Sequence, residues 1–228
     1  MAQEVTSKIK QKINPETVID QYGADTLRLY EMFMGPLERV KPWSMQGVKG
    51  VSNFLVKSYN FFGNKDHLTK DKEDPQTLKL LHQTIKKVSS DIEELKFNTA
   101  ISQLMIFTNH CHKIKSISNE TAKTFALLLS PFAPHLGEEL WQICGQDQTL
   151  AYASWPTHQE ELTKEDKMNF PVQVNGKTKV VIEVDADISK DDLLELVKNH
   201  EKIKKLLDGK NLVKEIVVPK KIINLIIK

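Results

Sequence analysis

The stretch PQTLKLLHQTIKKVSSDIEEL, residues 75–95, decides the fold of the larger part of the chain. Two apolar residues per heptad place a hydrophobic stripe along one side of an α-helix. Asp74 before Pro75 is a typical helix start. Because the stripe is too short to require a coiled coil, it predicts one helix of a bundle. The stripe residues are separated by gaps of 3, 4, 3, 4 and 3: Leu78, Leu81, Ile85, Val88, Ile92 and Leu95.

Other helices are predicted on both sides of this stretch. Apolar residues recur there at helical spacing, and a capping residue or a proline stands before each run. The longest of these runs extends from about Ser44 to Phe62, and the last ends at Gly145. The sequence therefore indicates a mainly α-helical region. The residues predicted to begin its helices are Asn14, Asp25, Ser44, Asn98, Ser118 or Asn119, and Pro134.

The character of the sequence changes after Trp155-Pro156. Residues 157–169 are charged and lack periodicity, so they are predicted to be a linker. Asn175-Gly176 between two alternating segments is a strong β-hairpin signal. Ser189 with Asp192 forms an acidic capping box for one helix, and two β-rich runs follow at 213–218 and 222–227. A small α+β domain of order β-β-α-β-β is therefore expected over residues 170–228.

Composition is ordinary for a soluble globular protein, with 40% hydrophobic and 27% charged residues among 228. No apolar run is long enough for a membrane span, and the polar, basic N-terminus does not resemble a secretory signal. Cys111 and Cys144 match no metal or redox spacing, so both are predicted to be small buried hydrophobes. These features together favour a cytoplasmic protein.

The net charge of +2 is unevenly distributed. Residues 1–70 and 170–228 each carry an excess of three basic residues, and residues 71–169 carry an excess of four acidic ones. Only Arg28 and Arg39 are arginines, so the basic side chains favour phosphate contact through point charges over bidentate base readout. A genome rich in lysine codons explains the same bias equally well.

Several runs of the sequence are specific enough to compare with known families. They are NPETVIDQYGADTLRLYEMFMGPLE (14–38), PWS (42–44), GVKGVSNF (47–54), FNTAISQLM (97–105), SPFAPHLGEELW (130–141), ASWP (153–156), VQVNGKTK (172–179) and VPKKIINLIIK (218–228). In this order they closely resemble the C-terminal third of the bacterial leucyl-tRNA synthetase family, and the resemblance extends from about Thr6 to Lys228. SPFAPH alone resembles only the wider class I synthetase group for branched aliphatic amino acids. The C-terminal domain with VQVNGK narrows the resemblance to the leucine enzyme.

The resemblance implies three parts and a partner. Residues 1–35 would be a remnant of the stem-contact region, 36–156 a helical bundle of the anticodon-binding type, and 170–228 a C-terminal domain that reaches the tRNA elbow. The expected partner is tRNA, specifically tRNA-leucine, held through its backbone. The family activity is ATP-dependent ligation of leucine to tRNA, but no HIGH motif stands in this sequence, and the editing domain is also missing. No activity is therefore expected from this chain alone.

The second signature of the family, KMSKS, should stand just before Asn14-Pro15. The chain reads VTSKIKQKI there, so only Ser7, Lys8 and Lys10 remain of the loop. In the family the lysines of this loop neutralise charge on the ATP phosphates. The resemblance therefore implies a degenerate ATP loop, and neither a catalytic residue nor a bound cofactor is expected.

Three groups of side chains have a structural interpretation beside a functional one. His110 and His112 stand two residues apart on a helix and point about 200° apart, so they cannot share a metal. His135 follows Pro134 with no nucleophile nearby, which favours a helix-start role over acid–base chemistry. The three tryptophans are better suited to packing than to base stacking. No metal site is predicted.

The small C-terminal domain carries the candidates for RNA contact. Lys177 and Lys179 stand two residues apart after the hairpin turn, so they are expected to share a face. Others occupy the helix end and the second turn, and together they suit a phosphate backbone. The full candidate set is Lys177, Lys179, Lys202, Lys205, Lys220 and Lys221.

Three functions follow from these features. The first is a tRNA-binding module of a leucyl-tRNA synthetase or a paralogue of it, as a fragment or as a free-standing protein. The second is a small subunit that completes a split ligase by docking onto a separate catalytic chain. The third is a non-catalytic regulator that binds a synthetase or another structured RNA. Membrane binding is not expected in any of them.

Overall fold

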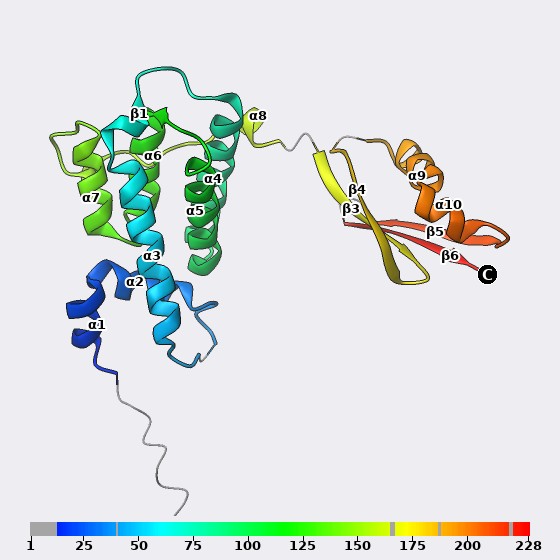
Figure 1. Ribbon diagram of the computed structural model, residues 1–228, viewed down its shortest axis with the longest axis horizontal. Coiled ribbons are helices and arrows are strands. Elements are labelled where there is room, and N and C mark those ends of the chain that lie inside the picture. The colour runs from blue at the N-terminus through cyan, green and yellow to red at the C-terminus, as the bar shows by residue number, and fades with distance from the viewer. Residues whose placement is uncertain (1–12, 40, 165–166, 187, 219–220) are drawn as a thin grey trace, which may run out of the picture. The chain divides into compact units, whose positions relative to one another are not determined.

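The computed structural model describes residues 13–39, 41–164, 167–186, 188–218 and 221–228, and the chain forms two compact units in it (Figure 1). The first unit ends at Thr163 and the second begins at Lys164. Each unit has a hydrophobic core of its own. The predicted fold class, a helical bundle followed by a small α+β domain, is confirmed.

The first unit is a helical bundle. Helices α3 to α7 lie side by side, and α1 and α2 lie against one end of them (Figure 1). Two short strands in the connections pair in parallel through Leu68 and Ile117. Its elements are α1 (Pro15–Tyr22), α2 (Ala24–Phe33), α3 (Met45–Phe62), η1 (Lys65–His67), β1 (Leu68–Thr69), α4 (Pro75–Glu93), α5 (Phe97–Cys111), β2 (Ile117–Ser118), α6 (Asn119–Leu129), α7 (Pro134–Ile143), η2 (Leu150–Tyr152) and α8 (Glu160–Thr163).

Three stacked phenylalanines form the centre of the bundle. The ring of Phe62 in α3 lies 3.9 Å from that of Phe125 in α6 and 6.4 Å from that of Phe107 in α5, centroid to centroid. All three side chains are fully buried. Aromatic rings bury large apolar areas and add a geometric preference of their own. The stack therefore fixes α3, α5 and α6 relative to one another.

Helix α4 begins as predicted, but its last stripe residue is misplaced. Asp74 accepts hydrogen bonds from the backbone N–H groups of Gln76 and Thr77, so it caps the helix. The helix ends at Glu93, and Leu95 lies in the following turn with φ of +56° and its side chain 58% exposed. Lys96 N–H bonds the carbonyl of Asp91 at 2.7 Å, which closes the helix end. Leu95 therefore stands where a helix end favours glycine, and the prediction that it joins the core is wrong.

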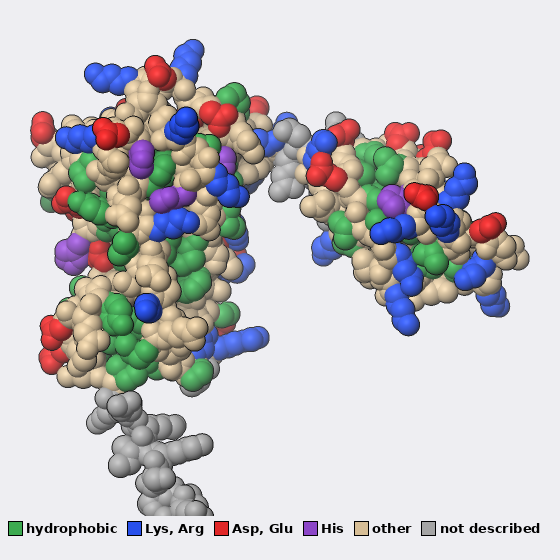
Figure 2. Space-filling view, in the orientation of Figure 1, with side chains coloured by type: hydrophobic (Ala, Val, Ile, Leu, Met, Phe, Trp, Pro, Cys, Tyr) green, Lys and Arg blue, Asp and Glu red, His purple; other side chains and the backbone are tan. Residues whose placement is uncertain are grey.

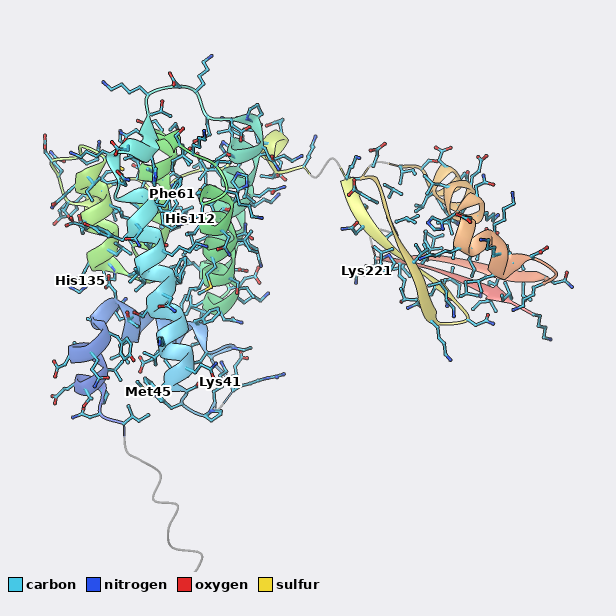
Figure 3. The ribbon with its side chains drawn as sticks, in the orientation of Figure 1. Lys41, Met45, Phe61, His112, His135 and Lys221 are labelled. Atoms are coloured by element: carbon cyan, nitrogen blue, oxygen red, sulfur yellow. The ribbon has the colours of Figure 1, made fainter. Side chains whose placement is uncertain are left out.

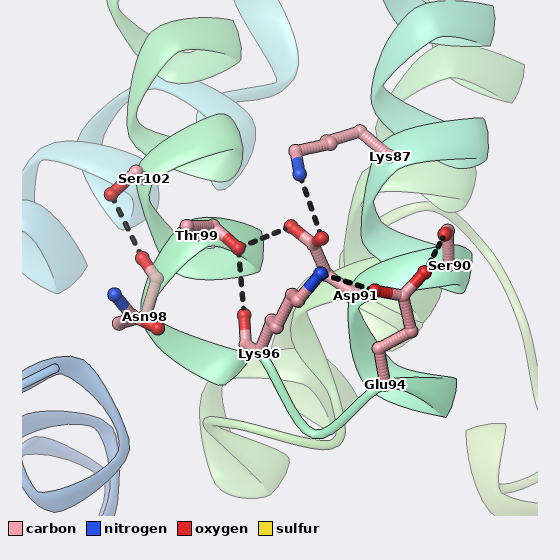
Figure 4. A network of polar contacts seen from close by, with 8 residues as sticks. All are labelled: Lys87, Ser90, Asp91, Glu94, Lys96, Asn98, Thr99 and Ser102. Atoms are coloured by element: carbon pink, nitrogen blue, oxygen red, sulfur yellow. Dashed lines mark hydrogen bonds and ion pairs between the residues drawn. The ribbon is translucent and has the colours of Figure 1, made fainter. Parts of the chain in front are cut away.

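A network of polar side chains connects α4 and α5 at the junction where Leu95 was expected to pack (Figure 4). The buried carboxylate of Asp91 accepts from Lys87 Nζ at 2.7 Å and from Thr99 Oγ1 at 2.6 Å. Thr99 lies in the first turn of α5, whose N-cap residue, Lys96, makes no side-chain capping bond. The carboxylate thus stands near a helix N-terminus, where negative charge is favoured.

Most predicted helix starts are confirmed and two are wrong. Asn14, Ser44 and Ser118 each accept a hydrogen bond from the first turn of their helix. Helix α5 begins at Phe97, before Asn98. Asp25 does not cap its own helix either, because α2 begins at Ala24 after Gly23, whose φ of +87° turns the chain.

The predicted linker at 157–169 is shorter than expected. Residues 160–163 form α8, and this segment packs along α4. Gln159 N–H donates to Nδ1 of His82 at 3.1 Å, and Lys86 pairs with Glu160. The charged residues of this segment are therefore partners of α4, which is why they lack a periodicity of their own. The second unit already has strand residues at Lys167.

The second unit is a four-stranded sheet of order β4-β3-β6-β5 with two helices. The outer pairs are antiparallel and the central pair, β3 with β6, is parallel. Asn175 and Gly176 have φ of +50° and +77°, as the predicted hairpin turn requires. Its elements are β3 (Lys167–Val174), β4 (Lys177–Asp185), α9 (Lys190–Asn199), α10 (Glu201–Leu207), β5 (Leu212–Val218) and β6 (Ile222–Ile227).

The single helix predicted for this unit is divided in two. Ser189 caps α9 as predicted, accepting from Asp192 N–H at 3.1 Å. The chain then becomes extended at His200, with φ of −64° and ψ of +127°. The ring nitrogen of His200 accepts from Lys202 N–H, so the same residue caps α10. The break directs Ile203 into the core while Leu196 stays 42% exposed.

Candidate nucleic-acid interface

Two neighbouring helices of the bundle contain no acidic residue. The sequence has neither Asp nor Glu over residues 39–65 or over residues 95–119, and these stretches contain α3 and α5. Acidic residues number 30 in the whole chain, so stretches of 27 and 25 residues without one are uncommon. A surface without carboxylates does not repel a polyanion. The sequence prediction overlooked this surface, although counting acidic residues along the chain reveals it.

Hydrogen bonds hold the two helices side by side. Lys57 Nζ donates to Asn109 Oδ1 at 2.6 Å, and the carbonyl of Lys57 lies 3.0 Å from Nε2 of His112. Below them the hydroxyl groups of Ser58 and Thr108 lie 3.4 Å apart in the interior. These contacts make one continuous surface of the two helices, which we call the α3–α5 face. It comprises Gln46, Lys49, Gly50, Asn53, Val56, Lys57, Asn60, Ile106, Asn109, His112 and Lys113.

The side chains of the α3–α5 face are open to solvent. Val56 is 55% exposed and Ile106 52%, and these apolar groups stand among amides and lysines. In Figure 2 the middle of this side of the bundle shows blue, purple, green and tan surface, with red atoms toward its edges. Lys49 and Lys113 form no ion pair with any residue that the structure describes. A weakly basic surface with exposed aliphatic groups results.

Two glycines of α3 differ in what surrounds them. A Cβ atom on Gly47 would lie 2.7 Å from the ring of Tyr30, so packing inside the protein requires this glycine. A Cβ atom on Gly50 would meet nothing within 4 Å. Glycine in a helix interior is less favourable than alanine by about 1 kcal/mol. Nothing within the described structure therefore requires Gly50.

The predicted lysines of the second unit do not form one cluster. Lys177 begins β4 and pairs with Val174, which lies level with Leu225 of β6. Lys221 directly precedes β6, at the opposite end of that strand (Figure 3). Four residues of strand separate the two levels, roughly 13 Å. The backbone positions of the two lysines are therefore well separated along the sheet. Lys220 lies outside the described residues.

Lys177 and Lys179 were predicted to share a face of the sheet, but the register of β4 against β3 does not support this prediction. Val180 pairs with Val172 and Thr178 with Gln173, so β4 contains one extra residue between these pairs. Such a bulge interrupts the alternation of side chains along a strand. Lys179 is that extra residue, and strict two-residue spacing does not hold there.

Ion pairing distinguishes the candidate lysines. Lys205 pairs with Glu201 at 2.9 Å on α10. Lys177, Lys179, Lys202 and Lys221 form no ion pair with a described residue. An unpaired lysine keeps its charge available to a phosphate. Their role in RNA contact remains a proposal.

The histidines considered for chemistry make structural contacts. His110 Nε2 lies 2.8 Å from Thr77 Oγ1, whereas His112 bonds the carbonyl of Lys57 and lies against Phe61, so the two point to different helices (Figure 3). His135 stands in the first turn of α7 with Nδ1 2.8 Å from Asp25 Oδ1. Among the described residues, no group of three or more His, Cys, Asp or Glu is placed to hold a metal.

The tryptophans and cysteines also have structural partners. Trp43 packs edge-on against Tyr30 at 4.8 Å, and Trp155 donates to Ser89 Oγ at 2.8 Å. Cys111 and Cys144 are free and buried, as predicted. Burial raises the pKa of the Cys144 thiol to about 11 and that of Cys111 further, so neither is a reactive thiolate at neutral pH.

Two earlier expectations concern other parts of the chain. Ser7, Lys8 and Lys10, the remnant of the ATP loop, lie outside the described residues. In the described part of the chain no helix is both long and apolar enough to cross a membrane.

Comparison with known proteins identifies the bundle. A family model described as the anticodon-binding domain of tRNA ligase matches residues 74–195, just over half of the chain. The match begins at the cap of α4 and ends within α9, so it includes α5 but not α3. A solved structure, the ternary complex of Agrobacterium radiobacter K84 agnB2 LeuRS with tRNA and LeuAMS, matches 95% of this chain and 30% of its own with a TM-score of 0.77 and 27% identity.

Curated relatives agree with that match. The leucine–tRNA ligase of Chlorobaculum tepidum is 44% identical over 230 residues, and that of Parabacteroides distasonis is 45% identical over 218. The alignments cover 99% and 94% of this chain but only 28% and 23% of the relatives. The chain thus spans about a quarter of their length. It belongs to the family of anticodon-binding domains of tRNA ligases, and its sequence corresponds to the C-terminal part of leucine–tRNA ligases.

Proposed function

We propose that the chain is a tRNA-binding module of a leucine–tRNA ligase, which positions tRNA-leucine and does not catalyse ligation alone. The α3–α5 face carries this proposal, because two adjacent helices without an acidic residue present lysines, amides and exposed apolar groups. The related structure named above was solved with tRNA. Backbone contact through lysines and neutral donors positions an RNA without reading its sequence.

The second unit supplies the other contacts in this proposal. In the second unit the proposed contacts are Lys177, Lys179, Lys202, Lys220 and Lys221. Because Lys177, Lys202 and Lys221 lie on different elements or at different levels of the sheet, these lysines suit successive phosphates of a backbone. Lys205 contributes less, since Glu201 already neutralises it.

We also propose that the module acts with a synthetase catalytic part, carried by a separate chain or by the same polypeptide. Relatives about four times as long support this, because the chain corresponds to only 28% of the Chlorobaculum tepidum ligase. The cytoplasm is the expected location, since tRNA charging takes place there. Mixing the chain with a competent catalytic part is expected to restore leucylation, and continued inactivity would count against this partner.

Filter binding with several tRNA transcripts, repeated across salt concentrations, tests the proposed function. Contacts to phosphates make the logarithm of the affinity fall linearly with the logarithm of salt concentration. We expect salt-dependent binding to every tRNA and the tightest binding to tRNA-leucine. Equal affinity for tRNA-leucine and an unrelated folded RNA would favour a general structured-RNA binder instead.

A further inference from the structure

The exposed side of α3 carries a row of neutral amides around an unexplained glycine. Gln46, Asn53 and Asn60 are exposed, and their side chains make no hydrogen bond to any described residue. The two ends of the row are 14 positions apart, roughly 21 Å at 1.5 Å per residue. Gly50 stands within it, and no neighbour limits the space above its Cα.

The amides outnumber the available charges on this surface. Lys49 is exposed, whereas the ammonium group of Lys57 already donates to Asn109 Oδ1. The Nδ2 group of Asn109 makes no hydrogen bond to a described residue and can still donate. A surface adapted only to phosphate would carry cations at these positions. Amide side chains both donate and accept hydrogen bonds, as the 2′-hydroxyl of ribose does.

We infer that α3 lies against the shallow minor groove of duplex RNA and contacts ribose 2′-hydroxyls through Asn53 and Asn60, with Gly50 allowing the close approach. The inference deepens the proposed function and rests on it. The minor groove of A-form RNA is wide and shallow and displays these hydroxyls, whereas the minor groove of B-DNA is narrow and has none. Glycine is common where a backbone approaches a ligand closely. The α3–α5 face therefore selects RNA duplex over DNA duplex.

The first test separates binding from folding at Gly50. G50A removes a poor helix former, so the thermal midpoint of the bundle is expected to rise. The added methyl group is expected to weaken binding of the 228-residue chain to a labelled RNA hairpin about fivefold, the value of one net hydrogen bond. T124A is the matched control, because Thr124 lies on α6 and bonds only the carbonyl of Glu120 in its own helix. Unchanged RNA affinity in G50A overturns the inference.

The second test compares RNA and DNA hairpins of the same sequence by fluorescence anisotropy. The native chain is expected to bind the RNA hairpin about 25-fold more tightly, the value of two such hydrogen bonds. N53A/N60A is expected to bring the two affinities close together by weakening RNA binding alone. Equal affinities of the native chain for both hairpins overturn the inference.

The two tests also separate this inference from the proposed function. A native chain that binds tRNA-leucine but tolerates G50A and N53A/N60A contradicts the minor-groove contact and leaves tRNA binding intact. A native chain that binds neither tRNA nor the RNA hairpin contradicts both.

Discussion

The carboxylate of Asp25 caps a helix whose first turn contains Leu136. Its Oδ2 accepts from Leu136 N–H at 2.8 Å, and its Oδ1 accepts from His135 N–H at 3.3 Å. The N-cap residue of α7 is Ala133, which has no side-chain acceptor. A side chain of α2, 111 positions earlier in the chain, thus completes the start of α7. This contact joins α2, which precedes α3, to α7, which follows α5 in the chain.

We expect D25A to destabilise the bundle by about 2 kcal/mol, because it removes a helix cap and leaves partly buried donors unpaired. All three tryptophans precede Thr163, so urea unfolding followed by their fluorescence reports on this unit alone. D20N is the control, since Asp20 is exposed and makes no described contact. Equal urea midpoints for D25A and the native chain would show that the cap contributes nothing.

Leu95 offers a stabilising substitution. Its φ of +56° is unfavourable for a residue with a Cβ atom, and its side chain buries little area. L95G is therefore expected to raise the free energy of unfolding by about 1 kcal/mol. L95A retains the Cβ atom and is expected to give no gain. If L95G lowers the free energy of unfolding in the same assay, the contacts of the Leu95 side chain stabilise the bundle by more than its positive φ destabilises it.

His82 is expected to make the bundle less stable in mild acid. Burial, and then the charge of His158, lowers the pKa of His82 below its ordinary value of 6.5. The unfolded chain therefore takes up a proton as pH falls below about 6.5, while the folded chain resists it. The contribution of neutral His82 to the free energy of unfolding is therefore complete above about pH 6.5. It is lost as pH falls through the lower pKa that His82 has in the folded chain.

H82Q removes this titrating group from α4. We expect the fall in the urea midpoint between pH 7 and pH 5 to be smaller in H82Q than in the native chain. H200Q is the control, because His200 lies in the second unit, whereas all three tryptophans lie in the first. An identical fall in H82Q would assign the acid sensitivity to the carboxylates.

The lysines of the second unit are expected to contribute to affinity through charge alone. Removing two phosphate contacts in K177A/K202A should reduce the salt slope of tRNA binding by about 2. K167A/K198A is the matched pair, because these lysines already pair with Glu183 and Glu215. Equal slopes for the two double variants would contradict the assignment of RNA contact to the unpaired lysines.

Local signals in the sequence predicted most of the architecture. The heptad stripe of α4, the caps at Asn14, Ser44 and Ser118, and the Asn175-Gly176 turn each depend on residues a few positions apart. Short-range chemistry of this kind is readable without a structure. The resemblance to leucyl-tRNA synthetases was carried by similar short runs and is supported by the relatives.

Contacts between distant residues were not predictable in the same way. Asp25 has the sequence signature of a cap, yet its partner is 111 residues away. The bulge at Lys179 and the helix break at His200 depend on how the strands and helices pack. The α3–α5 face was missed because attention to lysine clusters overlooks a surface defined by missing carboxylates.

Charge reversal on the α3–α5 face tests the central claim most directly. The measurement is a fluorescence anisotropy titration of labelled tRNA-leucine with the native chain and with K49E/K113E, whose lysines are exposed and lack described ion pairs. We predict salt-dependent binding by the native chain and an affinity at least about tenfold lower for the variant, since each reversal replaces attraction to phosphate with repulsion. Superimposable titrations for the two proteins, with both folded, would contradict the account.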